Sequence, residues 1–344
     1  MSLLAGLLTQ LPDLALSMES RLPEPSAQPP TLSDKDVLEL SLALSSLVYA
    51  DHYLCKSLEL LTNKLHQLGL LPAHRKEEII ALMKLDSIQR KRSSINTHFV
   101  PLNQVQDIRI GFFYKSRRVA WRDWVGRFEK PSGVILCIFD EVIIAFRGTS
   151  KYNLKSSLNN FNLRHSRIAA GNHAHRGFVR KLHQASNGYE TVLKAMIGDG
   201  NQVITFTGHS NGGAQAMIAA LEMALDLRSP PLNIRRVITW AGVSGLYGGT
   251  VNSYNAILGQ RTLQVVNEKD SLAKLMDVLG VKRVLGLLLI RISEEAVNAD
   301  PHDRVNSYLP ILHSLVNMDD ATLSSTCQRA VQDKSFTIQL PVKL

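Results

Sequence analysis

The residues from 203 to 227 read VITFTGHSNGGAQAMIAALEMALDL, an apolar run, a glycine-rich turn and an apolar helix-like stretch. Val203 to Phe206 is β-prone, and Ala214 to Leu227 has the composition of a helix. Between them, Gly208-His209-Ser210-Asn211-Gly212 fits the pattern G-x-S-x-G. Such a strand–turn–helix arrangement holds a serine hydroxyl clear of the sheet, at the positive end of the helix dipole. The segment therefore predicts a nucleophile at Ser210.

Four further apolar runs predict strands around this segment. Gly133 to Phe139 and Val142 to Phe146 flank a polar turn and predict a hairpin or a pair of neighbouring strands. Val237 to Trp240 and Leu263 to Val266 follow the serine. Short buried strands that alternate with helices imply a sheet covered on both faces. We therefore expect an α/β fold of the α/β-hydrolase type, with a mostly parallel central sheet and an N-terminal helical extension.

The N-terminal part differs from the rest of the chain in its composition and in the spacing of its apolar residues. Residues 1–31 are rich in proline, which favours extended chain, and they are expected to form a flexible leader and linker. Ser33 and Asp36 form a capping-box pattern that precedes apolar residues at helical spacing up to Val48. A second helical run covers 54–68, and a further helix is expected over roughly 76–90.

These patterns divide the chain into three parts. The leader at 1–31 is followed by a helical N-terminal segment at 32–100 and a catalytic domain at 101–344. No stretch reaches the roughly 20 apolar residues of a membrane-spanning helix. The nearest, Val284 to Ile290, is expected to be a buried strand or helix, or a surface segment that touches lipid.

The N-terminus lacks the features of a conventional secretory signal. No Lys or Arg precedes its apolar run, which breaks at Pro12. The expected location is cytoplasmic, peripheral on a membrane, or outside the cell by a signal-independent route. The three cysteines, at 55, 137 and 327, are too widely spaced to suggest a disulfide framework or a zinc site. They favour a reducing compartment.

The net charge of +9 is concentrated in two segments. Between Arg90 and Lys130 there are ten Lys and Arg against three Asp and Glu, and between Val142 and Tyr189 there are eight against none. Focused positive charge attracts anionic partners such as phospholipid surfaces. Basic and aromatic residues also alternate over 114–124, but no nucleic-acid-binding module surrounds them, so nucleic acid is disfavoured.

A serine nucleophile needs a histidine base and an acid that orients it, in the chain order Ser, Asp or Glu, His for this fold. The strand at 263–266 runs into Glu268 and Asp270, and both are candidates because catalytic groups lie at the carboxyl ends of such strands. Only His302 and His313 follow. His302 lies in a polar turn, whereas His313 lies in an apolar helical context that is more typical of a core residue. The pattern favours His302 and leaves His313 as the alternative base.

The chain resembles the class 3 lipases, the fungal-type triacylglycerol lipase family, over about 133–309. Four sequence elements match the family in order, namely Ala145 to Thr149, His175 to Phe178, Gly208 to Gly213, and Val265 to Asp270. The resemblance implies an α/β-hydrolase fold and activity on lipid esters. Sixty residues separate Ser210 from Asp270, a spacing typical of the family.

The resemblance also assigns roles. It places Ser210, Asp270 and His302 in a catalytic triad. It makes the backbone N–H of Thr149, often helped in the family by the hydroxyl at this position, one half of the oxyanion hole and the backbone N–H of Asn211 the other half. No metal or organic cofactor is implied. Two departures change the surroundings of the site. Asn211 replaces the usual leucine, and the family's Asp-Trp after the oxyanion loop is missing, with 154–161 in its place.

A third departure concerns the base. Tyr308 lies one residue further from His302 than the family pattern leads us to expect, which keeps His313 as the alternative. A lid is expected at about 150–171, inside the acid-free basic stretch, and its charge favours anionic phospholipid over neutral triglyceride.

The predicted activity is serine-dependent hydrolysis of lipid carboxylic esters by a lipase or phospholipase A, through an acyl-enzyme. Two alternatives remain open. One is a thioesterase or small-ester esterase on the same fold, and the other is a non-catalytic lipid-binding or interaction protein. The sequence leaves the oligomeric state open.

Overall fold

The fold is known from a computed structural model, in which residues 31–344 form one compact unit. The expected leader at 1–31 lies almost wholly outside the described residues, as does the helix expected over 76–90. The residues that the structure describes are 31–49, 54–70, 97–100, 108–113, 131–149, 164–196, 202–226, 233–271, 283–292, 300–303, 306–333 and 335–340.

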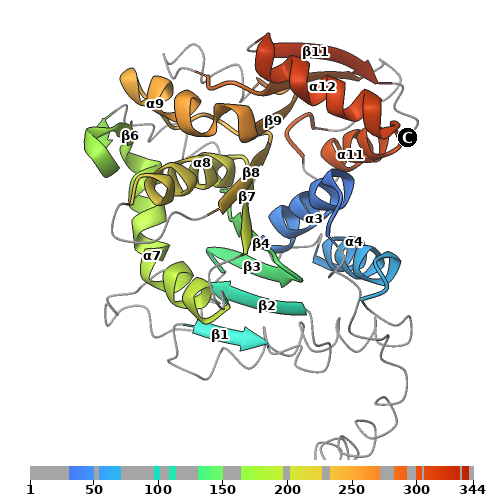
Figure 1. Ribbon diagram of the computed structural model, residues 1–344, viewed down its shortest axis with the longest axis horizontal. Helices are drawn as coiled ribbons and strands as arrows, with labels where there is room; N and C mark the ends of the chain where they lie inside the picture. Colours follow the sequence, from blue (N-terminus) through green and yellow to red (C-terminus); the bar gives the residue numbers. More distant parts are fainter. Residues whose placement is uncertain are drawn as a thin grey trace, which may run out of the picture. The chain divides into compact units, whose positions relative to one another are not determined.

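Nine strands of the described part pair into one sheet in the order β1-β2-β3-β4-β7-β8-β9-β10-β11, as Figure 1 shows. The pairs from β1 to β4 are antiparallel, and every pair from β4 onward is parallel. The sheet is mostly parallel, as predicted. The strands are β1 (Thr97–Val100), β2 (Ile108–Phe113), β3 (Gly133–Ile138), β4 (Glu141–Phe146), β7 (Val203–His209), β8 (Asn233–Trp240), β9 (Thr262–Asn267), β10 (Leu287–Ile292) and β11 (Ser335–Leu340).

Helices cover both faces of the sheet (Figure 1). Two large hydrophobic cores result among the described residues: α7, α8 and α9 enclose one of them, and α3, α4, α11 and α12 enclose the other. These helices are α3 (Asp34–Leu47), α4 (Leu54–Gln67), α7 (Arg176–Met196), α8 (Asn211–Ala224), α9 (Gly249–Leu258), α11 (Tyr308–Val316) and α12 (Asp320–Gln332). A short hairpin of β5 (His165–Arg167) and β6 (His173–His175) precedes α7. Within the described residues, no helix has both the length and the apolar composition that crossing a membrane requires.

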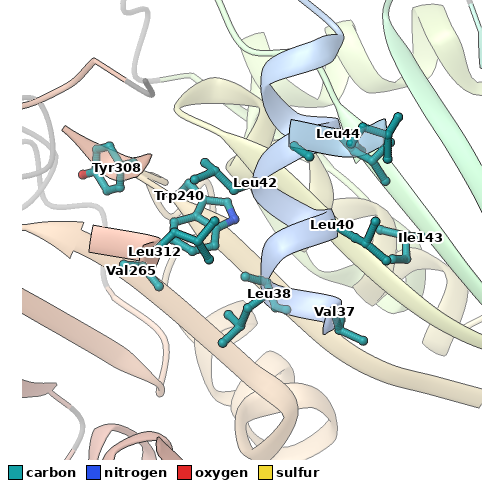
Figure 2. Close-up of a cluster of buried hydrophobic side chains, with 14 of the residues drawn as sticks. Val37, Leu38, Leu40, Leu42, Leu44, Ile143, Trp240, Val265, Tyr308 and Leu312 are labelled. Atoms are coloured by element: carbon teal, nitrogen blue, oxygen red, sulfur yellow. The ribbon is translucent and has the colours of Figure 1, made fainter. Parts of the chain in front are cut away.

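Helix α3 is a central part of its core. It packs against β7, β4 and β8 and against α11, and nearly all its side chains after the first turn are buried. A helix that is apolar on all sides must be buried on all sides. Leucines of α3 lie between Ile143 of β4 and the pair Trp240 and Leu312 (Figure 2). Its serines bond to the sheet, since Ser41 Oγ accepts from Trp240 Nε1 at 2.9 Å.

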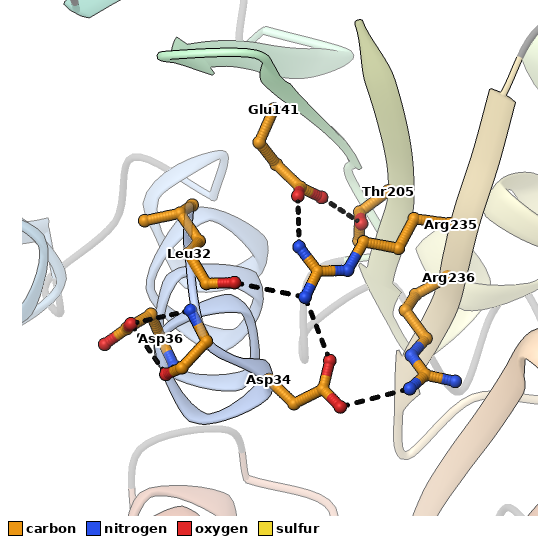
Figure 3. A network of polar contacts seen from close by, with 8 residues as sticks. Leu32, Asp34, Asp36, Glu141, Thr205, Arg235 and Arg236 are labelled. Atoms are coloured by element: carbon orange, nitrogen blue, oxygen red, sulfur yellow. Dashed lines mark hydrogen bonds and ion pairs between the residues drawn. The ribbon is translucent and has the colours of Figure 1, made fainter. Parts of the chain in front are cut away.

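The start of α3 is fixed by a polar network (Figure 3). The predicted capping box is confirmed, with the Ser33 side chain accepting from the Asp36 backbone N–H. Arg235 of β8 donates to the buried carboxylate of Glu141 at 2.6 Å and also to Asp34 at 3.1 Å. Burial raises the pKa of Glu141, while Thr205 and Arg235 favour its charged form. The network therefore anchors the first turn of α3 to the sheet.

The strands that the sequence predicts are present, and α4 and α8 follow the expected helical runs. The run at 133–146 is the hairpin of β3 and β4, and the segment at 284–290 contributes β10, a strand in the sheet interior. The structure adds the two edge strands β1 and β11 and, next to β1, strand β2.

Removing a leucine side chain from α3 is expected to destabilise the fold. Leu40 is completely buried in the core, so Leu40→Ala removes apolar contacts and leaves a cavity. We expect the free energy of unfolding to fall by about 2–5 kcal/mol in chemical denaturation. The control is Ile257→Ala, because Ile257 is 38% exposed and its loss is expected to cost about 0.5 kcal/mol or less. Equal effects of the two substitutions would contradict a structural role for α3.

Candidate active site

Ser210 lies at a sharp turn between β7 and α8, in a backbone conformation that few non-glycine residues adopt. Its φ is 57° and its ψ is −126°. Strain of this kind persists only where the surroundings enforce it, and it is common at functional sites. The neighbouring glycines are required by close backbone approach. A Cβ on Gly208 would collide with the backbone of Gly212, and a Cβ on Gly212 would collide with the carbonyl of Phe146. The segment therefore has the sharp strand–turn–helix geometry that a nucleophile elbow requires.

The Ser210 hydroxyl is buried and has no hydrogen-bond partner among the described residues. Its backbone is held in place, because the Ser210 N–H donates to the Trp240 carbonyl at 2.9 Å and its own carbonyl accepts from Gly213 at 2.9 Å. Leaving a buried hydroxyl unpaired costs stability. A buried hydroxyl that lacks a hydrogen-bond partner on a rigidly held backbone calls for an explanation other than packing, and a functional role for the Ser210 hydroxyl supplies one.

Asp270 and His302 form a buried pair beside the elbow. Asp270 follows the end of β9 and is 1% exposed, and its Oδ2 lies 2.8 Å from His302 Nδ1. A carboxylate accepts only, so Nδ1 carries the proton in this contact and Nε2 of a neutral ring is left as an acceptor. Among the described residues, His302 Nε2 is also buried and without a partner. The ring is therefore poised to take a proton at Nε2.

Tyr308 and Asn267 connect Asp270 to the segment that follows His302. The Tyr308 hydroxyl donates to Asp270 Oδ2 at 3.2 Å and accepts from the Asn267 backbone N–H at 3.0 Å. Burial, with the negative charge of Asp270 beside it, raises the pKa of Tyr308, so the hydroxyl keeps its proton. The Asn267 side chain donates to Ser307 Oγ at 2.9 Å. The end of β9 and the start of α11 are thus held together around Asp270.

His209, the residue before the serine, bonds to the segment that carries His302. Its Nε2 donates to the His302 carbonyl at 3.0 Å, and its Nδ1 accepts from the Tyr49 hydroxyl at 3.0 Å. The two imidazole ring centroids lie 4.9 Å apart. This contact places His302 next to the turn that carries Ser210, and Tyr49, just after α3, bonds to His209.

No hydrogen bond joins Ser210 to His302 in this structure, because both Ser210 Oγ and His302 Nε2 are unpaired among the described residues. Catalytic hydrogen bonds are often long in the absence of substrate and shorten when it binds. The two unpaired atoms belong to neighbouring segments, since His302 contacts His209.

Thr149 and Asn211, the two residues expected at the oxyanion hole, are in direct contact. The Asn211 side-chain amide donates to Thr149 Oγ1, and so does Lys181 Nζ of α7, at 3.0 Å. Gln215 joins the same elements by donating to the Arg147 carbonyl at 3.0 Å and the Asn211 carbonyl at 3.2 Å. The end of β4 is therefore tied to the first turn of α8, where backbone N–H groups are unsatisfied.

The alternative residues lie elsewhere. Glu268 forms an ion pair with Arg291 at 2.6 Å, and His313 is exposed on α11. Most of the expected lid, 150–163, lies outside the described residues. Cys137 is buried in β3, and burial raises the pKa of its thiol to about 11, which makes it an inert core residue.

Residues 143–279 match the family model for lipase (class 3). This segment, 137 of the 344 residues, resembles the class 3 lipase family. The match identifies a carboxylic ester hydrolase of the lipase type, and the lipase family implies a lipid substrate. The matched segment includes Thr149, Ser210, Asn211 and Asp270 and ends before His302.

Three solved structures illustrate what this lipase is similar to. Lipase II from Rhizopus niveus is 15% identical, with 75% of this chain and 80% of that chain covered and a TM-score of 0.45. The triacylglyceride lipase of Rhizomucor miehei is also 15% identical, with 66% and 83% covered and a TM-score of 0.43. The lipase of Rhizopus microsporus var. chinensis is 14% identical, with 79% and 80% covered and a TM-score of 0.45. No protein of curated function matches the chain.

Sequence reasoning did not find four residues that support this site. They act across long separations in the chain, for example 160 residues between Tyr49 and His209. Local sequence patterns do not predict such long-range contacts. His209 is part of the G-x-S-x-G motif, but the motif does not predict its hydrogen bond to the His302 carbonyl. The four are Tyr49, Lys181, His209 and Gln215.

Proposed function

We propose that this lipase hydrolyses carboxylic esters of phospholipids as a phospholipase A and that it releases fatty acid through an acyl-enzyme on Ser210. In this proposal His302 is the general base, Asp270 orients it, and Thr149 and Asn211 donate to the oxyanion. The supporting observation is the pair of buried, unpaired atoms, Ser210 Oγ and His302 Nε2, next to a 2.8 Å bond from His302 to Asp270.

The proposed chemistry proceeds in two halves. His302 Nε2 takes the proton from Ser210 Oγ as the oxygen attacks the ester carbonyl, and the imidazolium that forms is stabilised by Asp270. The imidazolium then protonates the departing alcohol oxygen, which leaves the fatty acyl group on Ser210. Water gives a proton to His302 Nε2 as it attacks the acyl carbonyl, and the imidazolium returns this proton to Ser210 Oγ as the acyl–oxygen bond breaks and the fatty acid leaves. The positive end of α8 and the nearby N–H groups favour the oxyanion in both halves.

The preference for anionic lipid rests on charges close to this site. Arg164, Arg167 and Arg176 are exposed on or beside the β5–β6 hairpin, where the Arg176 N–H donates to the Arg164 carbonyl at 2.9 Å. Arg176 begins α7, and Lys181 of the same helix reaches Thr149 about one and a half turns later. No Asp or Glu occurs from 164 to 189. Uncompensated positive charge near the site attracts an anionic lipid surface.

Lipid product analysis tests the proposal. Fatty acid release from phosphatidylglycerol vesicles is expected to exceed release from a triolein emulsion by about tenfold or more at low ionic strength. Raising the salt to about 0.5 M should reduce the difference, because it screens exposed charges. The double variant R164Q/R167Q should slow cleavage of the vesicles. R329Q is the control, since Arg329 is exposed on α12, an element that is separate from the β5–β6 hairpin and from α7.

Ser210→Ala gives the background rate of fatty acid release for each lipid, because it lacks the proposed nucleophile. Faster cleavage of triolein, or equal slowing by R164Q/R167Q and R329Q, would contradict the anionic phospholipid preference and leave a neutral-lipid lipase. Preferential cleavage of an acyl-CoA would instead identify a thioesterase. Lipid binding without any ester cleavage would contradict the catalytic proposal itself.

A further inference from the structure

The Thr149 hydroxyl, at the candidate oxyanion hole, accepts hydrogen bonds from two donors. Lys181 Nζ donates to Thr149 Oγ1 at 3.0 Å, and the Asn211 side-chain amide donates to the same oxygen. The donors come from different elements, α7 and α8, and meet at the residue that follows the end of β4 by three positions. Neither contact is needed to form those helices.

The valence of a hydroxyl decides what the two contacts do. A hydroxyl oxygen has two acceptor lone pairs and one proton to donate. Lys181 has an ammonium group, which can only donate, and Asn211 donates through its amide nitrogen. Both acceptor positions of Thr149 are therefore occupied. The hydroxyl proton must point away from both donors, and no acceptor for it lies among the described residues.

We propose that Lys181 and the Asn211 side chain are positioning residues that fix the Thr149 hydroxyl as a donor to the reaction's oxyanion. This inference rests on the proposed function. Thr149 would then contribute its hydroxyl as well as its backbone N–H. A donor that is held in place before the reaction stabilises developing charge without reorganising. The role also explains the polar residue at 211, which the resemblance alone leaves as a departure.

Lys181 has a second effect through the same hydroxyl. An ammonium group that bonds to the hydroxyl oxygen withdraws electron density and makes its proton a stronger donor. This stronger hydrogen bond stabilises the substrate oxygen only when negative charge develops on it. Loss of Lys181 should therefore lower kcat and leave KM nearly unchanged. A lysine with a merely structural role would instead change the thermal midpoint or affect KM and kcat together.

A double-substitution cycle with p-nitrophenyl butyrate tests the inference, because this soluble ester reports the chemistry without lipid-surface binding. Thr149→Val keeps the backbone N–H and should lower kcat by about 100-fold. Lys181→Met should lower kcat by about tenfold in the wild-type background. In the Thr149→Val background, Lys181→Met should change kcat by less than about twofold, because the hydroxyl through which it acts is gone.

Three further variants sharpen the cycle. Lys181→Arg keeps a charged donor and should retain kcat within about threefold. Lys181→Gln keeps a neutral donor and should lie between arginine and methionine, so a folding defect of one variant does not remove the test. Arg180→Met is the matched control, since it deletes a positive charge from the adjacent, exposed position of α7 and should leave kcat unchanged.

The outcomes separate this inference from the proposed function. An equal loss from Lys181→Met in both backgrounds, or no loss in the wild type, would overturn the positioning role while hydrolysis by Ser210 stands. A wild-type protein that hydrolyses neither this ester nor phospholipid would overturn both. Loss of kcat only where the Thr149 hydroxyl is present, with KM unchanged, is the result that supports the inference.

Discussion

Ser210→Ala is expected to lower kcat for ester hydrolysis by about a millionfold. The substitution removes the atom that forms the acyl-enzyme. The residual rate should come only from water attack in a site that still binds the ester and stabilises an oxyanion. Initial-rate measurements with p-nitrophenyl butyrate and with phosphatidylglycerol vesicles would provide the comparison.

The same variant should fold as well as the wild type, which makes it a clean test. Ser210 Oγ is buried without a partner, so its removal breaks no hydrogen bond among the described residues. Deleting an unpaired buried hydroxyl is expected to leave the free energy of unfolding unchanged or to raise it slightly. A large loss of stability would show that the hydroxyl has a structural partner and would weaken its assignment as a nucleophile.

Asp270→Asn is expected to lower kcat by about 10⁴-fold while the fold is retained. The Asp270 carboxylate accepts from His302 Nδ1, which leaves Nε2 free to take the serine proton. An amide at 270 can donate to Nδ1, and the neutral ring then carries its proton on Nε2, where it cannot act as a base. Loss of the carboxylate also removes the charge that stabilises the imidazolium.

Two controls accompany this prediction. Glu268→Gln removes the alternative acid, which is paired with Arg291, and it should change kcat by less than about twofold. Tyr308→Phe removes one donor to Asp270 and should have a modest effect of about tenfold or less. Activity of Asp270→Asn within tenfold of the wild type, together with a large loss in Glu268→Gln, would reverse the assignment of the acid.

Much of this fold could be predicted from local sequence because its elements have strong local signals. The strand and helix around Ser210 differ sharply in composition from the glycine turn between them, and Ser33 with Asp36 specifies the start of α3. Strands β1 and β11 lie at the sheet edges. Partly buried and exposed side chains alternate from 336 to 339 in β11, so its apolar signal is weaker than that of an interior strand. The central position of α3 depends on packing against β4, β7 and β8, which no local pattern encodes.

The candidate site also contains residues that the sequence predicts and residues that only the tertiary structure reveals. Ser210 has a motif, and Asp270 and His302 follow from chain order and from the chemistry that a serine nucleophile needs. The choice of His302 over His313 remains a prediction, although the 2.8 Å bond from His302 to Asp270 supports it. The supporting contacts of Tyr49 and Lys181 arise where separate layers meet, so they required the three-dimensional arrangement.

The central claim is that one hydroxyl, on Ser210, attacks the substrate. Reaction of the purified protein with a fluorophosphonate, followed by peptide mass spectrometry, tests it most directly, because this reagent forms a stable adduct with an activated serine. We predict a single adduct on the peptide that contains Ser210, and no adduct in Ser210→Ala. An adduct on another residue, or ester hydrolysis that survives in Ser210→Ala, would contradict the assignment.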